Sequence, residues 1–170
     1  WYSKIYGLRY VSLRYFNAAG YDDKKRVIGI ENNSQNLIPI VMEVALGKKP
    51  HVPIFGNKHM TKDGTGVRDY VHVSDLAKAH IQAFKYILSK KKNLTINLGT
   101  ERGYSVLEVI KVAKEITKRE INYVFHKFRK GDVDKLIADC SLAIDLIGWD
   151  HQSSSLEKII HSTWSIYRKH

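Results

Sequence analysis

Apolar residues recur along this chain with two alternating spacings, and the alternation predicts an α/β fold. Short runs rich in β-branched and aromatic residues predict strands over residues 10–15, 51–55, 70–73, 95–98 and 122–125. Apolar residues three and four apart predict amphipathic helices over residues 36–46, 74–89, 106–116 and 156–167. The first residues read as the tail of a helix that ends at Gly7, and residues 21–35 read as a loop.

Polar residues at the predicted helix starts indicate how the helices are capped. Asn36 is an N-cap candidate, and Pro39 is tolerated in the first turn that follows it. Ser74 or Asp75 can cap the helix that follows the strand 70–73. Ser105 and Glu108 have the spacing of a capping box. On the helix 74–89, His80 falls on the predicted apolar stripe, which favours a structural role for it.

Length and composition favour a single domain with a real core. The chain has 170 residues, and no apolar run approaches the roughly 20 residues that span a bilayer, so we expect no membrane insertion. Cys140 is the only cysteine, which excludes an internal disulfide and favours a reducing compartment, the cytoplasm. The chain starts at Trp1 without a signal peptide, and a start without Met suggests a piece of a longer protein.

The net charge of +11 raises the hypothesis of a nucleic-acid partner. However, the lysines are spread along the chain, and the densest run, Lys90–Lys92, lies between a predicted helix and a predicted strand, where a solvated turn is expected. No zinc-finger spacing occurs, and the histidines show no metal-like pairing. We therefore expect no nucleic acid and favour a small anionic ligand.

The stretch 55–76 carries the densest candidate chemistry. Gly64 and Gly66 flank Thr65 in a polar loop, and glycines allow a backbone to approach a ligand closely. Arg68 follows where the loop enters a strand, and its guanidinium fork matches phosphate oxygens. An ordinary loop whose arginine pairs with Asp69 or Asp63 explains the same spacing equally well.

Residues 61–77, Thr-Lys-Asp-Gly-Thr-Gly-Val-Arg-Asp-Tyr-Val-His-Val-Ser-Asp-Leu-Ala, resemble the signature loop of the UDP-glucose 4-epimerases, which belong to the extended short-chain dehydrogenase/reductases. Arg14-Tyr15-Phe16-Asn17, Arg129-Lys130-Gly131-Asp132 and Leu146-Ile147-Gly148-Trp149 continue the likeness. It covers essentially the whole chain but only the C-terminal half of the family's length. The fold it implies is the α/β, C-terminal substrate-binding part of an NAD(P)-binding Rossmann-type epimerase, with the last strands of the Rossmann sheet.

The resemblance also implies ligand contacts. It places Phe16 beside the nicotinamide of NAD, although core packing explains a phenylalanine there as well. The substrate-binding residues that it implies are Asn17, Asn36, Leu37, Phe55, Arg68, Arg129, Asp132 and Leu136. Among these, Asn17 and Arg129 would contact the diphosphate, Phe55 the uracil, and Asp132 the ribose. Leu136 departs from the tyrosine often found at a position held to exclude N-acetyl sugars, so a pocket open to UDP-N-acetylhexosamines is expected.

Two motifs of the family are missing. No G-x-G-x-x-G follows a predicted strand, because Gly64 and Gly66 precede one. Tyr-x-x-x-Lys occurs at Tyr21, Tyr86 and Tyr123, but none of these strings lies on a helix just before the strand 10–15, so we expect no catalytic residue in this chain. Residues 1–170 are then the substrate-binding half, and the NAD-binding half is absent. Its absence should expose apolar surface near the strand 10–15 and favour self-association.

The activity that the resemblance implies is the NAD-dependent interconversion of UDP-galactose and UDP-glucose in galactose metabolism, by an enzyme that forms homodimers. The hexose must turn over between two hydride transfers, so binding energy has to come from the uridine diphosphate. Three alternatives stay open. They are a related nucleotide-sugar epimerase or dehydratase, a non-catalytic UDP-sugar-binding module, and a basic RNA-binding module, whose binding would collapse with salt.

Overall fold

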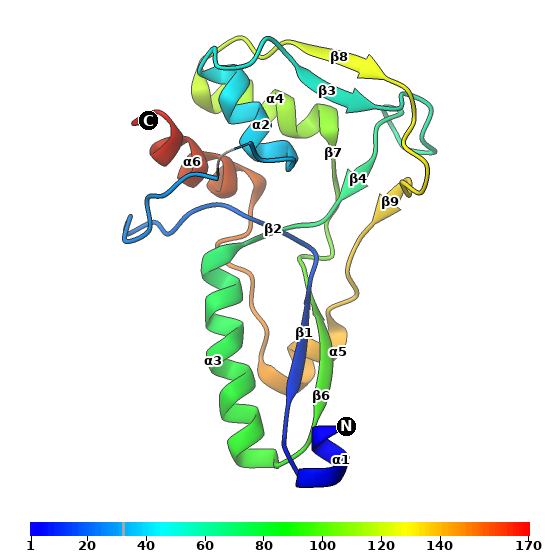
Figure 1. The fold of residues 1–170 in the computed structure, drawn as a ribbon, viewed down its shortest axis with the longest axis vertical. Coiled ribbons are helices and arrows are strands. Elements are labelled where there is room, and N and C mark those ends of the chain that lie inside the picture. The colour runs from blue at the N-terminus through cyan, green and yellow to red at the C-terminus, as the bar shows by residue number, and fades with distance from the viewer. Residues whose placement is uncertain (32) are drawn as a thin grey trace.

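The structure is a computed structural model that describes residues 1–31 and 33–170 (Figure 1). The elements follow in the order α1 (Tyr2–Tyr6), β1 (Val11–Tyr15), β2 (Asn17–Ala19), α2 (Leu37–Ala45), β3 (Val52–Phe55), β4 (Val67–Arg68), β5 (Tyr70–His72), α3 (Val73–Lys90), β6 (Leu94–Leu98), β7 (Tyr104–Ser105), α4 (Val106–Thr117), β8 (Tyr123–His126), β9 (Lys135–Leu136), α5 (Ser141–Ile147) and α6 (Leu156–Tyr167). The alternation of strands and helices confirms the predicted α/β class.

Strands β1 and β6 form a parallel pair in which Val11 lies opposite Leu94 and Tyr15 opposite Leu98. Apolar residues of one face of this pair pack with α3 and α5 into a core that includes Leu13, Ile96 and Leu98. Ser12, Arg14 and Thr95, which alternate with them, are exposed on the opposite face. Parallel sheets are normally covered on both faces. This pair therefore has the character of one edge of a larger sheet.

A second hydrophobic core lies beyond the end of this sheet, where α2, α4 and α6 pack together beside β3 (Figure 1). Its centre consists of Val41, Met42, Val109, Ile159 and Ile160, which are all nearly inaccessible to solvent. Strands β3 and β8 pair in parallel above these helices, and β4 pairs with both β7 and β9. The two cores are joined by residues 67–72, which form β4 and β5. This segment includes Arg68, the arginine that follows the loop of Gly64 and Gly66.

Asp69 joins four segments at this junction through its carboxylate and its backbone carbonyl. It is completely buried. It accepts hydrogen bonds from the backbone of Thr100, Glu101 and Ala138 and from the Thr100 hydroxyl, at donor–acceptor distances of 2.7 to 3.1 Å. Its own backbone carbonyl accepts from the Asn17 amide at 2.8 Å. A buried carboxylate with this many donors is compensated for its lost hydration.

Most predicted elements form within one or two residues of their expected bounds, including the capping box of Ser105 and Glu108. The predicted cap of α3 is wrong. Neither Ser74 nor Asp75 caps it, because His72 occupies the N-cap and its ring accepts from the Ser74 amide. His80 is exposed rather than on a buried stripe, although it does lie 2.7 Å from the Tyr15 hydroxyl. The pairs β2–β5 and β7–β4–β9 were missed, since strands of two or three residues show no period.

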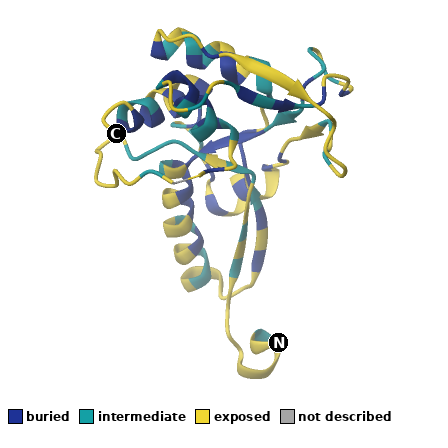
Figure 2. Ribbon diagram, turned by 45° about the horizontal axis from the view of Figure 1, so that its top comes forward, coloured by how far each residue is buried: buried dark blue, intermediate teal, exposed yellow. Residues whose placement is uncertain are grey.

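The predicted exposure of apolar surface is confirmed around the β1–β6 unit. Tyr10 and Tyr15 are exposed at the ends of β1, and Ile81, Phe84 and Leu88 form an exposed row along α3 (Figure 2). These α3 positions are three and four residues apart and so share one side of the helix. The exposed surface therefore lies on the part of the fold whose sheet is incomplete.

We predict that Asp69→Asn lowers the free energy of unfolding by about 3 kcal/mol or more, because an amide presents donors to groups that already donate. Thermal and urea unfolding followed by circular dichroism measure this change. Asp145→Asn is the matched control, since Asp145 lies exposed on α5. Equal losses for the two variants would contradict the role assigned to the Asp69 carboxylate.

We predict a second effect at His72. Burial lowers the pKa of His72, and its Nδ1 accepts from the Ser74 amide, so the folded protein holds the ring neutral. The unfolded chain protonates near pH 6.5, above the folded pKa. Stability is therefore unaffected above about pH 6.5 and falls as pH drops below it. The stability advantage of the wild type over His72→Gln should shrink from pH 7.5 to pH 5.5, and an unchanged difference would refute the assignment.

Candidate functional site

A cavity of about 300 Å³ opens between the start of α2, the end of β3, β4 and the loop before β9. The residues that line it are Asn17, Gln35, Asn36, Leu37, Ile40, Pro53, Phe55, His59, Gly66, Arg68, Tyr70, Val106, Arg129 and Asp132. They come from segments more than one hundred residues apart in the chain, so the site exists only in the folded protein. The segments that meet here include the stretch 55–76.

Asn17, Asn36 and Leu37 form the wall on the α2 side. Asn36 stands at the N-cap of α2, as predicted, but its side chain makes no capping hydrogen bond. Its amide group is therefore available to the cavity. Asn17 is fixed by its backbone bond to Asp69 and also borders an adjoining cavity of about 200 Å³. The helix N-terminus adds a favourable field for an anion at this wall.

Phe55 and Arg129 meet on the opposite wall. The Arg129 guanidinium carbon lies 3.5 Å from the centroid of the Phe55 ring, a close cation–π contact. The His126 ring lies 5.5 Å from the Phe55 ring, centroid to centroid. Phe55 is held by the β3–β8 pairing, whereas Arg129 is exposed on the loop after β8. An aromatic ring and an exposed cation thus share one side of the cavity.

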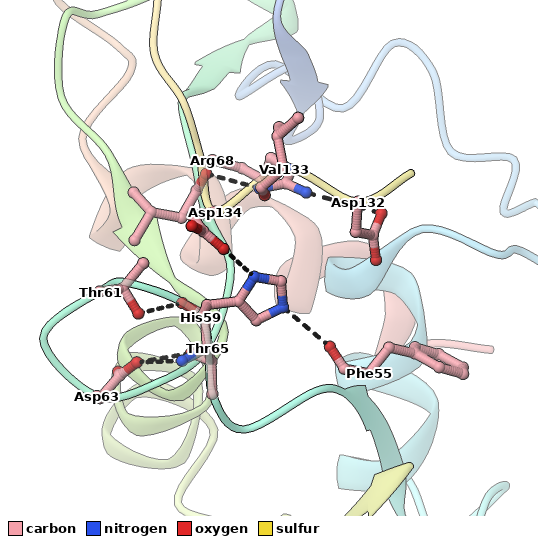
Figure 3. A network of polar contacts seen from close by, with 10 residues as sticks. Phe55, His59, Thr61, Asp63, Thr65, Arg68, Asp132, Val133 and Asp134 are labelled. Atoms are coloured by element: carbon pink, nitrogen blue, oxygen red, sulfur yellow. Dashed lines mark hydrogen bonds and ion pairs between the residues drawn. The ribbon is translucent and has the colours of Figure 1, made fainter. Parts of the chain in front are cut away.

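Arg68 is aimed by backbone oxygens rather than by the expected carboxylates. Its Nη1 donates to the carbonyls of Val67 and Val133 at 2.9 and 2.8 Å, and its Nη2 lies 3.9 Å from Asp132 Oδ1 (Figure 3). The predicted ordinary alternative, a pair with Asp69 or Asp63, is wrong. The Asp69 carboxylate already accepts hydrogen bonds from Thr100, Glu101 and Ala138.

Asp63 is also engaged elsewhere. Its carboxylate accepts from the amide and hydroxyl of Thr65, and from the Ser105 hydroxyl. Burial raises the pKa of Asp63, but these hydrogen bonds outweigh burial and hold the pKa below its ordinary value. The loop is thereby anchored to α4, and Gly66 leaves room for the Arg68 guanidinium, which would lie 3.3 Å from a Cβ at that position.

Two predicted site residues lie outside this cavity. Phe16 is half-buried against the β1–β6 core, and its amide donates to the Leu98 carbonyl. Leu136 lies opposite Arg68 in the β4–β9 pair and is exposed. Neither residue lines the adjoining cavity. Phe16 thus packs against the β1–β6 core and Leu136 stands beside the cavity, and the roles of both toward a ligand stay predictions.

Several lining residues were not predicted, among them Gln35, Ile40, His59, Tyr70 and Val106. No spacing in the sequence distinguishes them from core or loop residues. Tyr70 is buried, and burial raises its pKa to about 12, although the nearby charge of Arg68 opposes that shift. The Tyr70 hydroxyl is thus neutral at physiological pH, and it cannot act there as a proton acceptor of the kind a phenolate provides.

The arrangement suits binding of a flat ring and an anion at once. Two guanidinium groups supply positive charge, Phe55 supplies an aromatic face, and Asp132 supplies acceptors for hydroxyl groups. In the part of the chain that the structure describes, no three His, Cys, Asp or Glu residues are grouped as metal ligands. No helix among the described residues is long and apolar enough to cross a membrane.

The profile of the family described as GDP-mannose 4,6 dehydratase matches residues 1–163. The chain belongs to this family. Within it, a UDP-glucose 4-epimerase from Halalkalibacterium halodurans is 41% identical over 170 residues, which is 100% of this chain and 51% of that protein. The chain spans about half the length of the curated relatives it matches.

Solved structures of the family share the fold described above. A UDP-glucose-4-epimerase from Stenotrophomonas maltophila, with bound NAD and formylated UDP-arabinopyranose, superposes with a TM-score of 0.91 at 36% identity, over 95% of this chain and 48% of that one. The UDP-Glc/GlcNAc 4-epimerase of Campylobacter jejuni gives a TM-score of 0.81 at 32% identity, over 99% of this chain and 51% of that one. The sequence resemblance to UDP-glucose 4-epimerases, and the C-terminal half of their Rossmann-type fold, are confirmed.

Proposed function

We propose that this chain is the substrate-binding half of a UDP-glucose 4-epimerase, and that its cavity holds UDP-glucose and UDP-galactose by their uridine diphosphate. One observation carries the proposal. The substrate-binding residues expected from the sequence, with the exception of Leu136, come from distant segments and line a single cavity. Similarity to proteins that bind UDP-sugars supports the same assignment.

The geometry of Arg68, Asp132 and Arg129 suits each of them to bind a particular part of the ligand. Arg68, already aimed by two carbonyls, offers its remaining donors to the diphosphate. Asp132 accepts from the ribose hydroxyls. Arg129 covers Phe55 in this structure, and it is exposed, so we expect it to leave the ring for the diphosphate when the uracil arrives. A charge-assisted bond to phosphate outweighs an exposed cation–π contact of about 0.5–1 kcal/mol.

In the proposed binding mode the cavity holds the hexose only weakly, and weak binding of the hexose allows the reaction. Epimerisation at C4 needs the sugar to present both faces, so strong contacts to the hexose would oppose it. The chemistry that NAD supplies in such enzymes is reversible hydride transfer. The Gly64–Gly66 loop differs from the glycine fingerprint of a dinucleotide site, because it precedes strand β4 rather than following a strand and opening a helix. Phe16, which directly follows β1, is the residue that the resemblance places on the nicotinamide side.

We therefore propose that the NAD-binding half is separate from residues 1–170 and packs on the uncovered face and free edge of β1. The exposed Ser12, Arg14, Ile81, Phe84 and Leu88 support this docking position. A homodimer of the complete enzyme and a cytoplasmic location, consistent with the single buried Cys140, belong to the same proposal. Burial raises the pKa of the Cys140 thiol to about 11, so it is inert.

A second candidate is a UDP-sugar-binding module without activity. Residues 1–170 carry neither a Tyr-x-x-x-Lys string on a helix just before β1 nor a glycine fingerprint, so activity needs a separate NAD-binding half. A coupled assay of UDP-galactose conversion with added NAD separates the two candidates. Turnover by this chain alone would contradict both, and turnover only after a partner half is added would select the epimerase.

We predict that UDP-glucose binds the 170-residue chain and that Arg68→Ala weakens binding about tenfold or more, because a charge-assisted bond to phosphate is lost. Isothermal titration calorimetry measures both affinities. Arg26→Ala is the matched control, since Arg26 pairs with Asp22 on the surface away from the cavity. Equal affinities of the Arg68 and Arg26 variants would refute the site.

We further propose that Leu136 leaves room for an N-acetyl group on the sugar. It stands opposite Arg68 at the cavity's edge and is smaller than tyrosine. We expect Leu136→Tyr to lower conversion of UDP-N-acetylglucosamine about tenfold while conversion of UDP-glucose changes little, in the enzyme reconstituted with its NAD-binding half. If the wild type fails to convert N-acetylated sugars, this assignment is wrong.

A further inference from the structure

His59 is buried and lines the cavity, and Figure 3 shows its ring between Asp134 and Phe55. Its Nδ1 lies 2.9 Å from Asp134 Oδ1, and its Nε2 lies 3.2 Å from the backbone oxygen of Phe55. The Phe128 ring packs against it, with the two centroids 4.7 Å apart. The imidazole therefore connects the end of β3 to the segment that precedes β9.

Both partners of the ring can only accept. A backbone carbonyl has no proton, and an ionised carboxylate has none either. A neutral imidazole carries one N–H and would turn a lone pair toward one of these oxygens. The doubly protonated ring donates to both. The observed geometry therefore fits an imidazolium.

The segments that His59 joins carry the ligand-binding side chains. Phe55 supplies the aromatic platform, and its carbonyl is one of the two acceptors. Asp134 directly follows Val133, whose carbonyl aims Arg68, and the Asp134 carbonyl accepts from the Val67 amide next to Arg68. A shift of Asp134 would thus move the anchor of Arg68. The His59 ring is therefore linked directly to Phe55 and, through Asp134, to the backbone that holds Arg68.

We propose that His59 is a positioning residue whose protonation strengthens the binding of a nucleoside diphosphate sugar in this cavity. As an imidazolium it fixes Phe55 and the 129–134 loop in their binding positions, and it adds positive charge behind the diphosphate site. This inference rests on the function proposed above. It predicts a higher affinity for UDP-glucose at pH 6 than at pH 8, because only the doubly protonated ring donates to both oxygens.

Other ionisable groups lie on the segments next to the His59 ring, and they determine which control variants the test needs. On the segment after β8 they are His126, Arg129, Lys130, Asp132 and Asp134, on β4 it is Arg68, and on the histidine's own loop they are Lys58, Lys62 and Asp63. Of these groups, His126 is the other histidine. Its ring lies tilted beside the Phe55 ring, with the centroids 5.5 Å apart, so His126→Gln must be compared with His59→Gln.

The test measures UDP-glucose affinity by calorimetry at pH 6 and pH 8. UDP-glucose is suitable because its diphosphate is esterified at both ends and keeps its charge in this range. The wild type should bind about fivefold more tightly at pH 6. His59→Gln should abolish this difference, and Asp134→Asn, which removes the counter-charge with little change in shape, should reduce it. His80→Gln, on α3 outside the cavity, should keep it.

An equal pH dependence in the wild type and His59→Gln would overturn the proposal, and loss of the dependence only in His126→Gln would transfer it to that residue and refute it for His59. A measurement without ligand separates this failure from that of the proposed function. In chain labelled with ¹⁵N-histidine, the His59 ring should show two N–H groups at pH 6. A ring with one N–H at every pH refutes the imidazolium. Two N–H groups without any UDP-glucose binding would count against the ligand alone.

Discussion

The structure depends on the burial of one carboxylate next to one guanidinium. Asp69 faces inward, where the backbone amides of Thr100, Glu101 and Ala138 and the Thr100 hydroxyl surround its carboxylate. Because successive side chains of an extended segment point in opposite directions, its neighbour Arg68 faces the cavity. The same four donors that offset the desolvation of Asp69 keep it from pairing with Arg68. The arginine therefore retains donors for a ligand, and the two cores stay joined at the site.

The charges beside the cavity, rather than the net charge of the chain, indicate the kind of ligand. The net charge of +11 is spread along the chain, and Arg68 and Arg129 bring positive charge to the cavity. Asp132 and Asp134 stand among them, so the cavity is not a uniformly basic surface of the kind that non-specific nucleic-acid binding uses. Alternating charges beside an aromatic ring suit a ligand that has anionic, hydroxyl and aromatic parts. A nucleoside diphosphate has all three.

The sequence predicted much of the fold because the long elements carry clear periods. The row Leu76, Ala79 and Ala83 faces the core as expected, and the Ser105–Glu108 box forms. The pattern could not predict β2, β4, β7 or β9, which arise from pairing with distant segments. It also misplaced the cap of α3, since His72 takes that position only because Gly20 leaves room beside it.

The sequence predicted those residues of the candidate site that lie in motifs of the resembled family. Arg68, Arg129 and Asp132 were expected together and lie together, whereas their roles toward a ligand remain predictions. His59 was not predictable, because its two acceptors come from residues 4 and 75 positions away. The orientation of Arg68 toward Val133 likewise required the β4–β9 pairing. Such contacts between distant segments leave no spacing in the sequence.

The central claim is that the chain holds its ligand by the uridine diphosphate and leaves the hexose loose. Saturation-transfer difference NMR on UDP-glucose with the wild-type chain tests this claim most directly, because it reports how closely each ligand proton approaches the protein. We expect strong transfer to the uracil and ribose protons and weak transfer to the hexose protons. Strongest transfer to the hexose, or no transfer to the uracil, would contradict it.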